Sequence, residues 1–475
     1  MPASKNGGRS RRSRPAQLIG LPEDGTLSLQ EKLYQRLREL IRSGTFPRGS
    51  RLASSRALAA SLGISRNSVT AAIDRLIADG WLESRRNSGV YVAYAGKLVA
   101  AGAPIALERV SVPFQLGWPT HVFPVQLWTR LQMRRWKDTP GRWLQQGERL
   151  GLPALRSAIA AYLTTSRGLP CHAAQIVVTT AIPAGVEFAV QALGLSGAEA
   201  WIEDPCCQTP LEGLRRTNVR LAPIPIDEHG IVVEAAKELA PDARIAVVGP
   251  SCQAPTGVAL SESRREALIE WAEATGSWIF EDDFNYRVDP KRPLIPPLTA
   301  AGRGRSLYFN SFNSVLFPGL RIAYVVVPLD LISLFEAARG FEGEVSAPNQ
   351  IVLADFIEAG HLDEHLRRLE ASDAERRTAL MAAVTQHLGD FALPRNNAGE
   401  YFICRLKSLP ESAAVDSAAA AGIVVTPMSE YRTRSPTQQE IILGYSQHSP
   451  TAIEEAALAL RPVLESVAQY RSRTG

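Results

Sequence analysis

Apolar and polar positions alternate with a helical period near the start of the chain. Ser28 and Glu31 form a capping box, after which apolar residues recur at intervals of three and four until Ser43 and Gly44. The pattern predicts one amphipathic helix that ends at this glycine.

Two more helices are predicted at short intervals. Ser54 is the expected N-cap of a helix that ends at Gly63, and Ser65 is the expected N-cap of a helix whose apolar stripe ends at Gly80. Two short helices joined by a tight glycine turn are typical of a helix-turn-helix. The next segment, WLESRRNSGVYVAY, has two alternating runs around Arg86–Gly89, which predicts a β-hairpin, or wing.

This region closely resembles the GntR superfamily of winged helix-turn-helix repressors. The match covers about residues 28–93 and includes RLASSRALAASLGISRNSVTAAIDRLIADGWLESRRNSGVYV, with Ala53 where the family usually has proline. The resemblance implies that the arginine of the S-S-R step, the S-R-N-S start of the recognition helix and the wing glycine touch DNA. These positions are Arg56, Arg66, Asn67, Ser68 and Gly89.

Elementary chemistry favours the same interpretation. A recognition helix presents its first turn to base edges, where Arg66, Asn67 and Ser68 supply polar groups, and helix N-termini together with Arg56 can hold phosphates. Residues 1–95 also hold 16 Lys or Arg against 7 Asp or Glu, although the whole chain carries a net charge of only +4. The alternative for any single arginine is a solvated surface side chain.

Three short apolar runs further along the chain predict buried strands, at 243–250, 277–284 and 306–312. A helix with a capping box from Ser263 to Glu266 separates the first two, which predicts a βαβ unit in a parallel sheet. Polar residues follow each strand, where open α/β sheets bind ligands. We expect a pocket near Ser251, Gln253, Asp282, Asp283, Asn310 and Ser311.

Most of residues 114–460 resemble fold-type I aminotransferases that depend on pyridoxal phosphate. The segments that carry the likeness are FQLGWPTHVFPVQLWTRL, GERLGLPALRSAIAAYL, APTG, FEDDF and FNSVLFPGLRIAY. More narrowly, the chain resembles the MocR-type regulators, which fuse a GntR module to such a domain. The resemblance implies an α+β winged helix-turn-helix domain, then an α/β fold-type I aminotransferase-like domain with a smaller C-terminal α+β subdomain. It also implies a homodimer that binds double-stranded DNA and a small-molecule effector of unknown identity.

Several positions depart from the chemistry of that coenzyme. Catalysis with pyridoxal phosphate requires a lysine amine for the Schiff base, and the residue at the family's lysine position is Ser314, whose hydroxyl cannot form an imine. Ile442 replaces the arginine that takes a substrate carboxylate. Covalent binding of pyridoxal phosphate is therefore not expected. The other departures are Pro183 in the phosphate-facing loop, Cys207, Cys252, Ala254 and Phe284.

Asp282, Ser311 and Arg321 match the family's pyridine-binding and phosphate-binding positions, so together with Ser314 they predict a vestigial cofactor pocket. The alternative is that these residues only support the fold. Lys291 offers an amine from another direction, although a solvated loop lysine is the simpler interpretation.

We divide the chain into a disordered basic tail (1–26), the DNA-binding domain (27–93), a linker (94–112) and the aminotransferase-like domain (113–475), with a small subdomain from about 365. The absence of a long apolar run or a signal peptide predicts a cytoplasmic protein that does not enter membranes. The five cysteines lack metal-site spacing, so we expect free thiols and no metal.

The leading hypothesis is a transcription regulator whose aminotransferase-like domain senses a small molecule or mediates dimerisation, and which is not an enzyme. One alternative is a regulator that binds pyridoxal phosphate noncovalently or through another lysine. The third is an active aminotransferase with a DNA-binding arm.

Overall fold

The chain forms two compact units, Met1–Arg109 and Val110–Gly475. The computed structural model describes residues 19–21, 27–85, 88–93, 112–138, 148–283, 295–302, 305–339, 345–395, 401–433 and 439–474. The predicted linker lies almost wholly outside the described residues, as do Arg86 and Asn87 of the wing turn.

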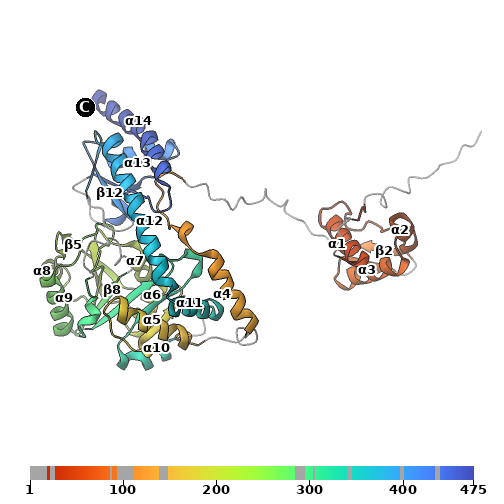
Figure 1. The fold of residues 1–475 in the computed structure, drawn as a ribbon, viewed down its shortest axis with the longest axis horizontal. Helices are drawn as coiled ribbons and strands as arrows, with labels where there is room; N and C mark the ends of the chain where they lie inside the picture. The colour runs from red at the N-terminus through yellow and green to blue at the C-terminus, as the bar shows by residue number, and fades with distance from the viewer. Residues whose placement is uncertain are drawn as a thin grey trace, which may run out of the picture. The chain divides into compact units, whose positions relative to one another are not determined.

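The first unit has the predicted winged helix-turn-helix, with three helices and a two-stranded antiparallel wing (Figure 1). Its elements are α1 (Leu29–Arg42), α2 (Ser55–Leu62), α3 (Arg66–Ala78), β1 (Leu82–Arg85) and β2 (Gly89–Val92).

The three predicted N-caps are confirmed. The hydroxyls of Ser28, Ser54 and Ser65 each accept a hydrogen bond from the backbone N–H three residues further on. Gly63 ends α2 with a φ of 67°, a left-handed conformation that glycine adopts without strain. Glu31 turns its carboxylate toward Arg75 at 2.6 Å, so it ties α1 to α3.

The core of this unit begins earlier in the chain than expected. Ile19 falls within the predicted disordered tail, yet only 1% of it is exposed, and it packs in the same cluster as Leu33, Leu37 and Leu76. That assignment was wrong at Ile19, because a single apolar side chain ahead of the first helix has no periodic partner that would reveal its burial.

The second unit contains an eight-stranded sheet with the order β3-β10-β9-β8-β7-β4-β5-β6. The three predicted strands are confirmed as β7 (Ile245–Val248), β8 (Trp278–Asp282) and β9 (Ser306–Ser311), and they pair in parallel. The others are β3 (Ile176–Thr179), β4 (Glu199–Asp204), β5 (Arg220–Asp227), β6 (Gly230–Ile231) and β10 (Ala323–Val326). Antiparallel pairs lie at both edges, which makes the sheet mixed.

Helices cover both faces of this sheet, which explains the unbroken apolar runs of its strands. Ile245 and Val247 point into one core, whereas Ala246 and Val248 point into another. On the first face lie α6 (Ile182–Ala192), α7 (Gln208–Arg215) and α10 (Ile332–Ala338), and on the second lie α5 (Pro153–Ser166), α8 (Val233–Leu239), α9 (Glu262–Thr275) and α11 (Ala347–Glu358).

The start of α9 corrects one prediction. Its N-cap is Ser261, whose hydroxyl accepts from the Arg264 N–H at 3.4 Å, and not Ser263 as the capping-box pattern suggested. Ser263 lies in the first turn, and its hydroxyl bonds that of Ser261 at 3.2 Å. Serine is a favoured N-cap residue at either position, and the glutamate three residues after Ser263 made the later serine look like the cap.

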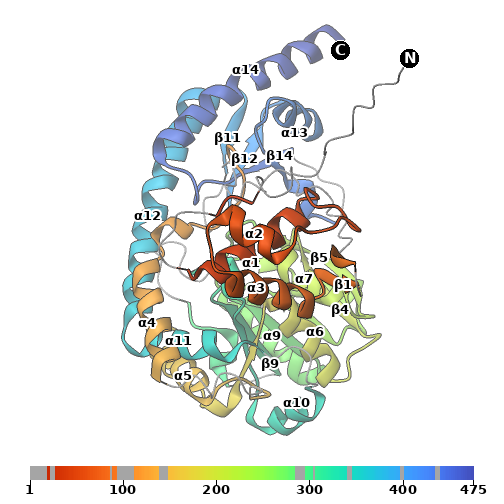
Figure 2. The ribbon, with the colours of Figure 1, turned by 90° about the vertical axis from the view of Figure 1, so that its right-hand side faces the viewer.

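The smaller α+β part of the second unit is a four-stranded antiparallel sheet with the order β11-β12-β14-β13. Its strands are β11 (Ala392–Pro394), β12 (Phe402–Leu406), β13 (Thr426–Pro427) and β14 (Glu440–Leu443). The helices around it are α12 (His361–Ala383), α13 (Glu411–Ala420) and α14 (Pro450–Thr474) (Figure 2). The remaining α-helix of the second unit among the described residues, α4 (Val125–Asp138), precedes α5 in the chain. No helix among the described residues is long and apolar enough to cross a membrane.

The segment that enters the second unit runs along this small sheet. Gly444 donates its N–H to the carbonyl of Phe114 at 2.8 Å, and Val424 donates to Pro113. A Cβ at Gly444 would lie 2.3 Å from the Gln115 carbonyl oxygen, so only glycine permits this approach. The contact places Gly117 and Trp118 beside the end of β14.

Candidate DNA-binding and ligand-binding sites

The first turn of α3 presents polar side chains to solvent. Arg66 and Asn67 are exposed, and Arg56, the second residue of α2, is exposed as well. Ser68 is half-buried, and its hydroxyl bonds that of Ser65 at 2.9 Å. Ser68 therefore takes part in the cap of α3 besides facing the proposed DNA surface.

The wing requires glycine at position 89. Its φ is 113°, and a Cβ there would lie 3.0 Å from Nε of Arg51. Gly89 pairs with Arg85 across the hairpin, and Arg51 bridges to the wing through Tyr91. The glycine thus lets a basic side chain lie against the tip of the wing.

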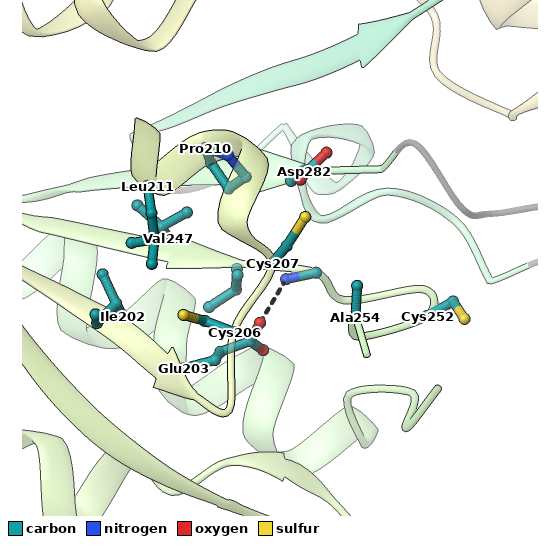
Figure 3. A pocket seen from close by; sticks show the side chains of 12 residues that line it. Ile202, Glu203, Cys206, Cys207, Pro210, Leu211, Val247, Cys252, Ala254 and Asp282 are labelled. Atoms are coloured by element: carbon teal, nitrogen blue, oxygen red, sulfur yellow. Dashed lines mark hydrogen bonds between the residues drawn. The ribbon is translucent and has the colours of Figure 1, made fainter. Parts of the chain in front are cut away.

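The second unit has a small cavity at the carboxyl ends of β4, β7 and β8, which we call the strand-end cavity (Figure 3). Asp282 and Glu203 supply its two carboxyl groups, and Cys206, Cys207 and Cys252 supply thiols. No lysine, arginine or histidine lines it among the described residues. It therefore presents acidic and apolar groups without a cationic partner for an anion.

Glu203 is deeply buried in this cavity. Burial raises its pKa to about 8, Asp282 adds to the rise, and the N–H of Gly249, which donates to Glu203 at 3.2 Å, opposes it. Glu203 is thus largely protonated at neutral pH.

Of the six polar residues expected at the strand ends, Asp282 alone lines the strand-end cavity. Asp283 instead forms a fully buried ion pair with Arg167 at 2.7 Å and accepts from the Tyr308 hydroxyl at 2.9 Å. Asn310 donates to the Asp283 carbonyl. Gln253 donates to the Pro205 carbonyl, and Ser251 accepts from Arg167. These groups hold the strand ends together.

The predicted cofactor residues Ser311, Ser314 and Arg321 lie outside the lining of the strand-end cavity. Ser311 and Ser314 are buried in one turn, where the Ser314 hydroxyl donates to the Ser311 carbonyl at 3.4 Å. Arg321 is exposed and has a φ of 57°. Neither these serines nor Arg321 lines the strand-end cavity, which Asp282 alone of the set reaches.

The other departures are placed as follows. Pro183 lies in the first turn of α6, and Cys207 and Ala254 line the strand-end cavity. Phe284 and Lys291 lie outside the described residues. All five cysteines are free thiols, and no cluster in the described part of the chain has the groups to hold a metal ion.

The second unit has another cavity, of about 220 Å³, which the sequence did not predict. We call it the aromatic cavity because its walls include Leu116, Trp118, Tyr401, Tyr431, Tyr445 and Ser446. The residues come from four separate segments, and only the pairing of β12 with β14 could have suggested that some of them meet. Tyr401 and Tyr431 form an edge-to-face pair with ring centroids 5.6 Å apart.

Comparisons with known proteins agree with this architecture. Residues 29–92 match the family of bacterial regulatory proteins of the gntR type, and residues 130–460 match aminotransferase class I and II. The chain is 31% identical to the probable rhizopine catabolism regulatory protein MocR of Rhizobium meliloti over 94% of its own length and 95% of that protein. The chain belongs to the MocR-type transcription regulators.

Another relative of this MocR-type regulator is the pyridoxine biosynthesis transcriptional regulator PdxR of Corynebacterium glutamicum, at 30% identity over 90% of the chain and 94% of the relative. Among solved structures, an archaeal alanine:glyoxylate aminotransferase matches with a TM-score of 0.68 at 20% identity, over 75% of the chain and 92% of that protein. LysN, an α-aminoadipate aminotransferase from Thermus thermophilus, matches with a TM-score of 0.66 at 20% identity, over 75% and 92%. These likenesses show the fold of the second unit.

Proposed function

We propose that this regulator binds double-stranded DNA through Arg56, Arg66, Asn67, Ser68 and Gly89. The observation that carries the proposal is the exposed first turn of α3, where the side chains of Arg66 and Asn67 lie in solvent beside the N-terminus of the helix. Arg56 and Arg66, together with the net positive charge of residues 1–95, suit a polyanionic partner such as DNA.

Sequence-specific binding to the DNA upstream of its own gene tests this role. We expect a gel shift that unlabelled specific DNA competes away and that scrambled DNA of the same length does not. If no DNA sequence is preferred, with or without small molecules, the proposal is wrong.

The second unit, in our proposal, senses a small molecule without catalysing transamination. The described residues do not fit a covalently held pyridoxal phosphate, because Ser314 offers a hydroxyl already bonded to Ser311 and Cys207 offers no ring to stack on the coenzyme. Pro183 also removes one N–H donor from the first turn of α6.

Reduction with borohydride after incubation with pyridoxal phosphate distinguishes these possibilities. We expect intact-mass spectrometry to find no pyridoxyl adduct. An adduct on any lysine would support the covalent alternative, and turnover of an amino donor that is lost in Asp282→Asn would support an active aminotransferase.

Noncovalent binding of pyridoxal phosphate is the second candidate, since Asp282 reaches the strand-end cavity and could pair with a pyridine nitrogen. Equilibrium dialysis of the wild type and of the Asp282→Asn variant with pyridoxal phosphate tests it.

We further propose a cytoplasmic homodimer, as two-fold symmetry suits paired half-sites. Light scattering should give twice the 51.6 kDa of one chain.

A further inference from the structure

The aromatic cavity lies next to the strand-end cavity. The N–H of Cys206, which lines the strand-end cavity, donates to the carbonyl of Tyr431, which lines the aromatic cavity, at 2.9 Å. The Thr433 N–H donates to Asp204 at 2.9 Å, and Gln208 donates to the Glu430 carbonyl at 3.0 Å. These bonds fasten the turn that carries Tyr431 onto the segment between β4 and α7.

The wall behind the aromatic cavity is apolar. Ile442 is fully buried in a cluster with Ile403, Met428 and Tyr431, and the half-buried Leu116 and Tyr401 pack against that cluster. Ile442 stands at the position of the arginine that takes a substrate carboxylate in aminotransferases. A carboxylate placed there would lose its hydration without gaining an ionic partner, which is costly.

No lysine, arginine or histidine lines the aromatic cavity among the described residues. Arg377 contacts one of its walls, since its Nε donates to the Tyr445 hydroxyl at 3.3 Å. The faces and edges of Trp118, Tyr401 and Tyr431 instead match an aromatic or cationic group.

We propose that the second unit binds an aromatic amine that lacks a carboxylate, with its ring and its ammonium group among the aromatic side chains of the aromatic cavity. The inference rests on the proposed sensing role of this unit and names the chemical class of its ligand. The same residues disfavour the corresponding amino acid, which has the same ring and amine and also carries a carboxylate.

Calorimetry of the full-length protein with matched probes tests the inference. The probes are 2-phenylethylamine, L-phenylalanine, which adds a carboxylate, and 3-phenylpropionate, which has a carboxylate and no amine. We expect 2-phenylethylamine to bind at least about tenfold more tightly than phenylalanine, since burying an unpaired carboxylate is unfavourable, and 3-phenylpropionate to bind least.

Two pairs of variants identify the walls responsible. Ile442→Arg should weaken 2-phenylethylamine and strengthen phenylalanine, whereas the uncharged control Ile442→Met should keep the original preference. Tyr431→Leu should weaken 2-phenylethylamine at least about fivefold by removing a ring, whereas Tyr431→Phe should not. The Tyr431 pair keeps the test decisive if Ile442→Arg fails to fold, as judged by its thermal melt.

The inference is overturned if phenylalanine binds as tightly as 2-phenylethylamine. Loss of phenylalanine binding in Arg377→Met would then identify Arg377 as the residue that holds the carboxylate. It is also overturned if a protein that still shifts its own DNA binds no 2-phenylethylamine up to about 10 mM. Loss of the specific DNA shift itself would instead refute the proposed function.

Discussion

Arg66 shows at the residue scale how one exposed side chain can specify a DNA sequence. It lies in the first turn of α3 and is exposed. If it contacts a base edge, Arg66→Ala should cost about 1–3 kcal/mol of specific binding and relax the preference at one base pair. Fluorescence anisotropy with the specific duplex and single-base variants, at one fixed salt concentration, measures this.

The matched control is Arg42→Ala, which removes the same charge from the exposed end of α1. We expect it to change specific binding by less than about 0.5 kcal/mol. Equal losses in both variants, with unchanged base preference, would mean that Arg66 contributes only general positive charge.

Glu203 makes stability depend on pH. Its pKa is raised from 4.5 to about 8 by burial, so the folded protein holds a proton that the unfolded chain releases near pH 4.5. The stabilisation by this bound proton is complete below pH 4.5 and is lost as pH rises through about 8. The free energy of unfolding then falls by a total on the order of a few kcal/mol.

Glu203→Gln keeps the shape and the acceptor for Gly249 but cannot ionise. It should therefore melt at a higher temperature than the wild type at pH 9 and at a similar temperature at pH 5, as followed by calorimetry of the second unit. Glu281 and Asp373, whose pKa values burial raises to about 7 and about 6, remain in both proteins, so the difference isolates Glu203. Parallel pH profiles would contradict the assignment.

At the scale of elements, the cap of α3 links folding to recognition. Ser65 accepts from the Ser68 N–H at 3.0 Å, so Ser65→Ala should destabilise the start of the helix by about 1 kcal/mol. Amides in its first turns should then exchange about fivefold faster by hydrogen-exchange mass spectrometry.

Ser65→Asp is the control, because an aspartate can cap the helix but places a negative charge at the proposed phosphate-binding end. We expect wild-type exchange rates with weaker DNA binding. If Ser65→Ala left exchange in α3 unchanged, the cap would be unimportant for local order.

Local rules predicted the elements that depend on local contacts. The caps and glycine ends of α2 and α3, and the strands β7 to β9, follow from residues a few positions apart. The burial of Ile19 and the ion pair between Arg167 and Asp283 did not, because each joins segments far apart in the chain. The aromatic cavity also depends on such distant contacts, since its walls come from residues 116–118, 401, 431 and 444–446.

The same distinction explains the outcome at the predicted cofactor positions. Each of Asp282, Ser311 and Ser314 was identified by its place in a motif, and the motif fixed which strand or turn carries it. A motif does not fix where a side chain finds its partner. The Ser314 hydroxyl bonds the carbonyl of Ser311 within its own turn, whereas Asp282 reaches the strand-end cavity.

At the scale of the whole molecule, the proposed sensing role requires a coupling free energy between two compact units that have separate cores. If 2-phenylethylamine changes the DNA affinity of the regulator by some factor, the specific DNA must change the affinity for 2-phenylethylamine by the same factor. We expect a factor of about five or more in both directions. Anisotropy titrations with saturating amine and calorimetry with saturating DNA measure the two sides, and 3-phenylpropionate serves as the inactive ligand. If the amine binds and the DNA affinity is unaltered, then the second unit binds the ligand without transmitting its presence, and a role in assembly would explain the unit better than sensing.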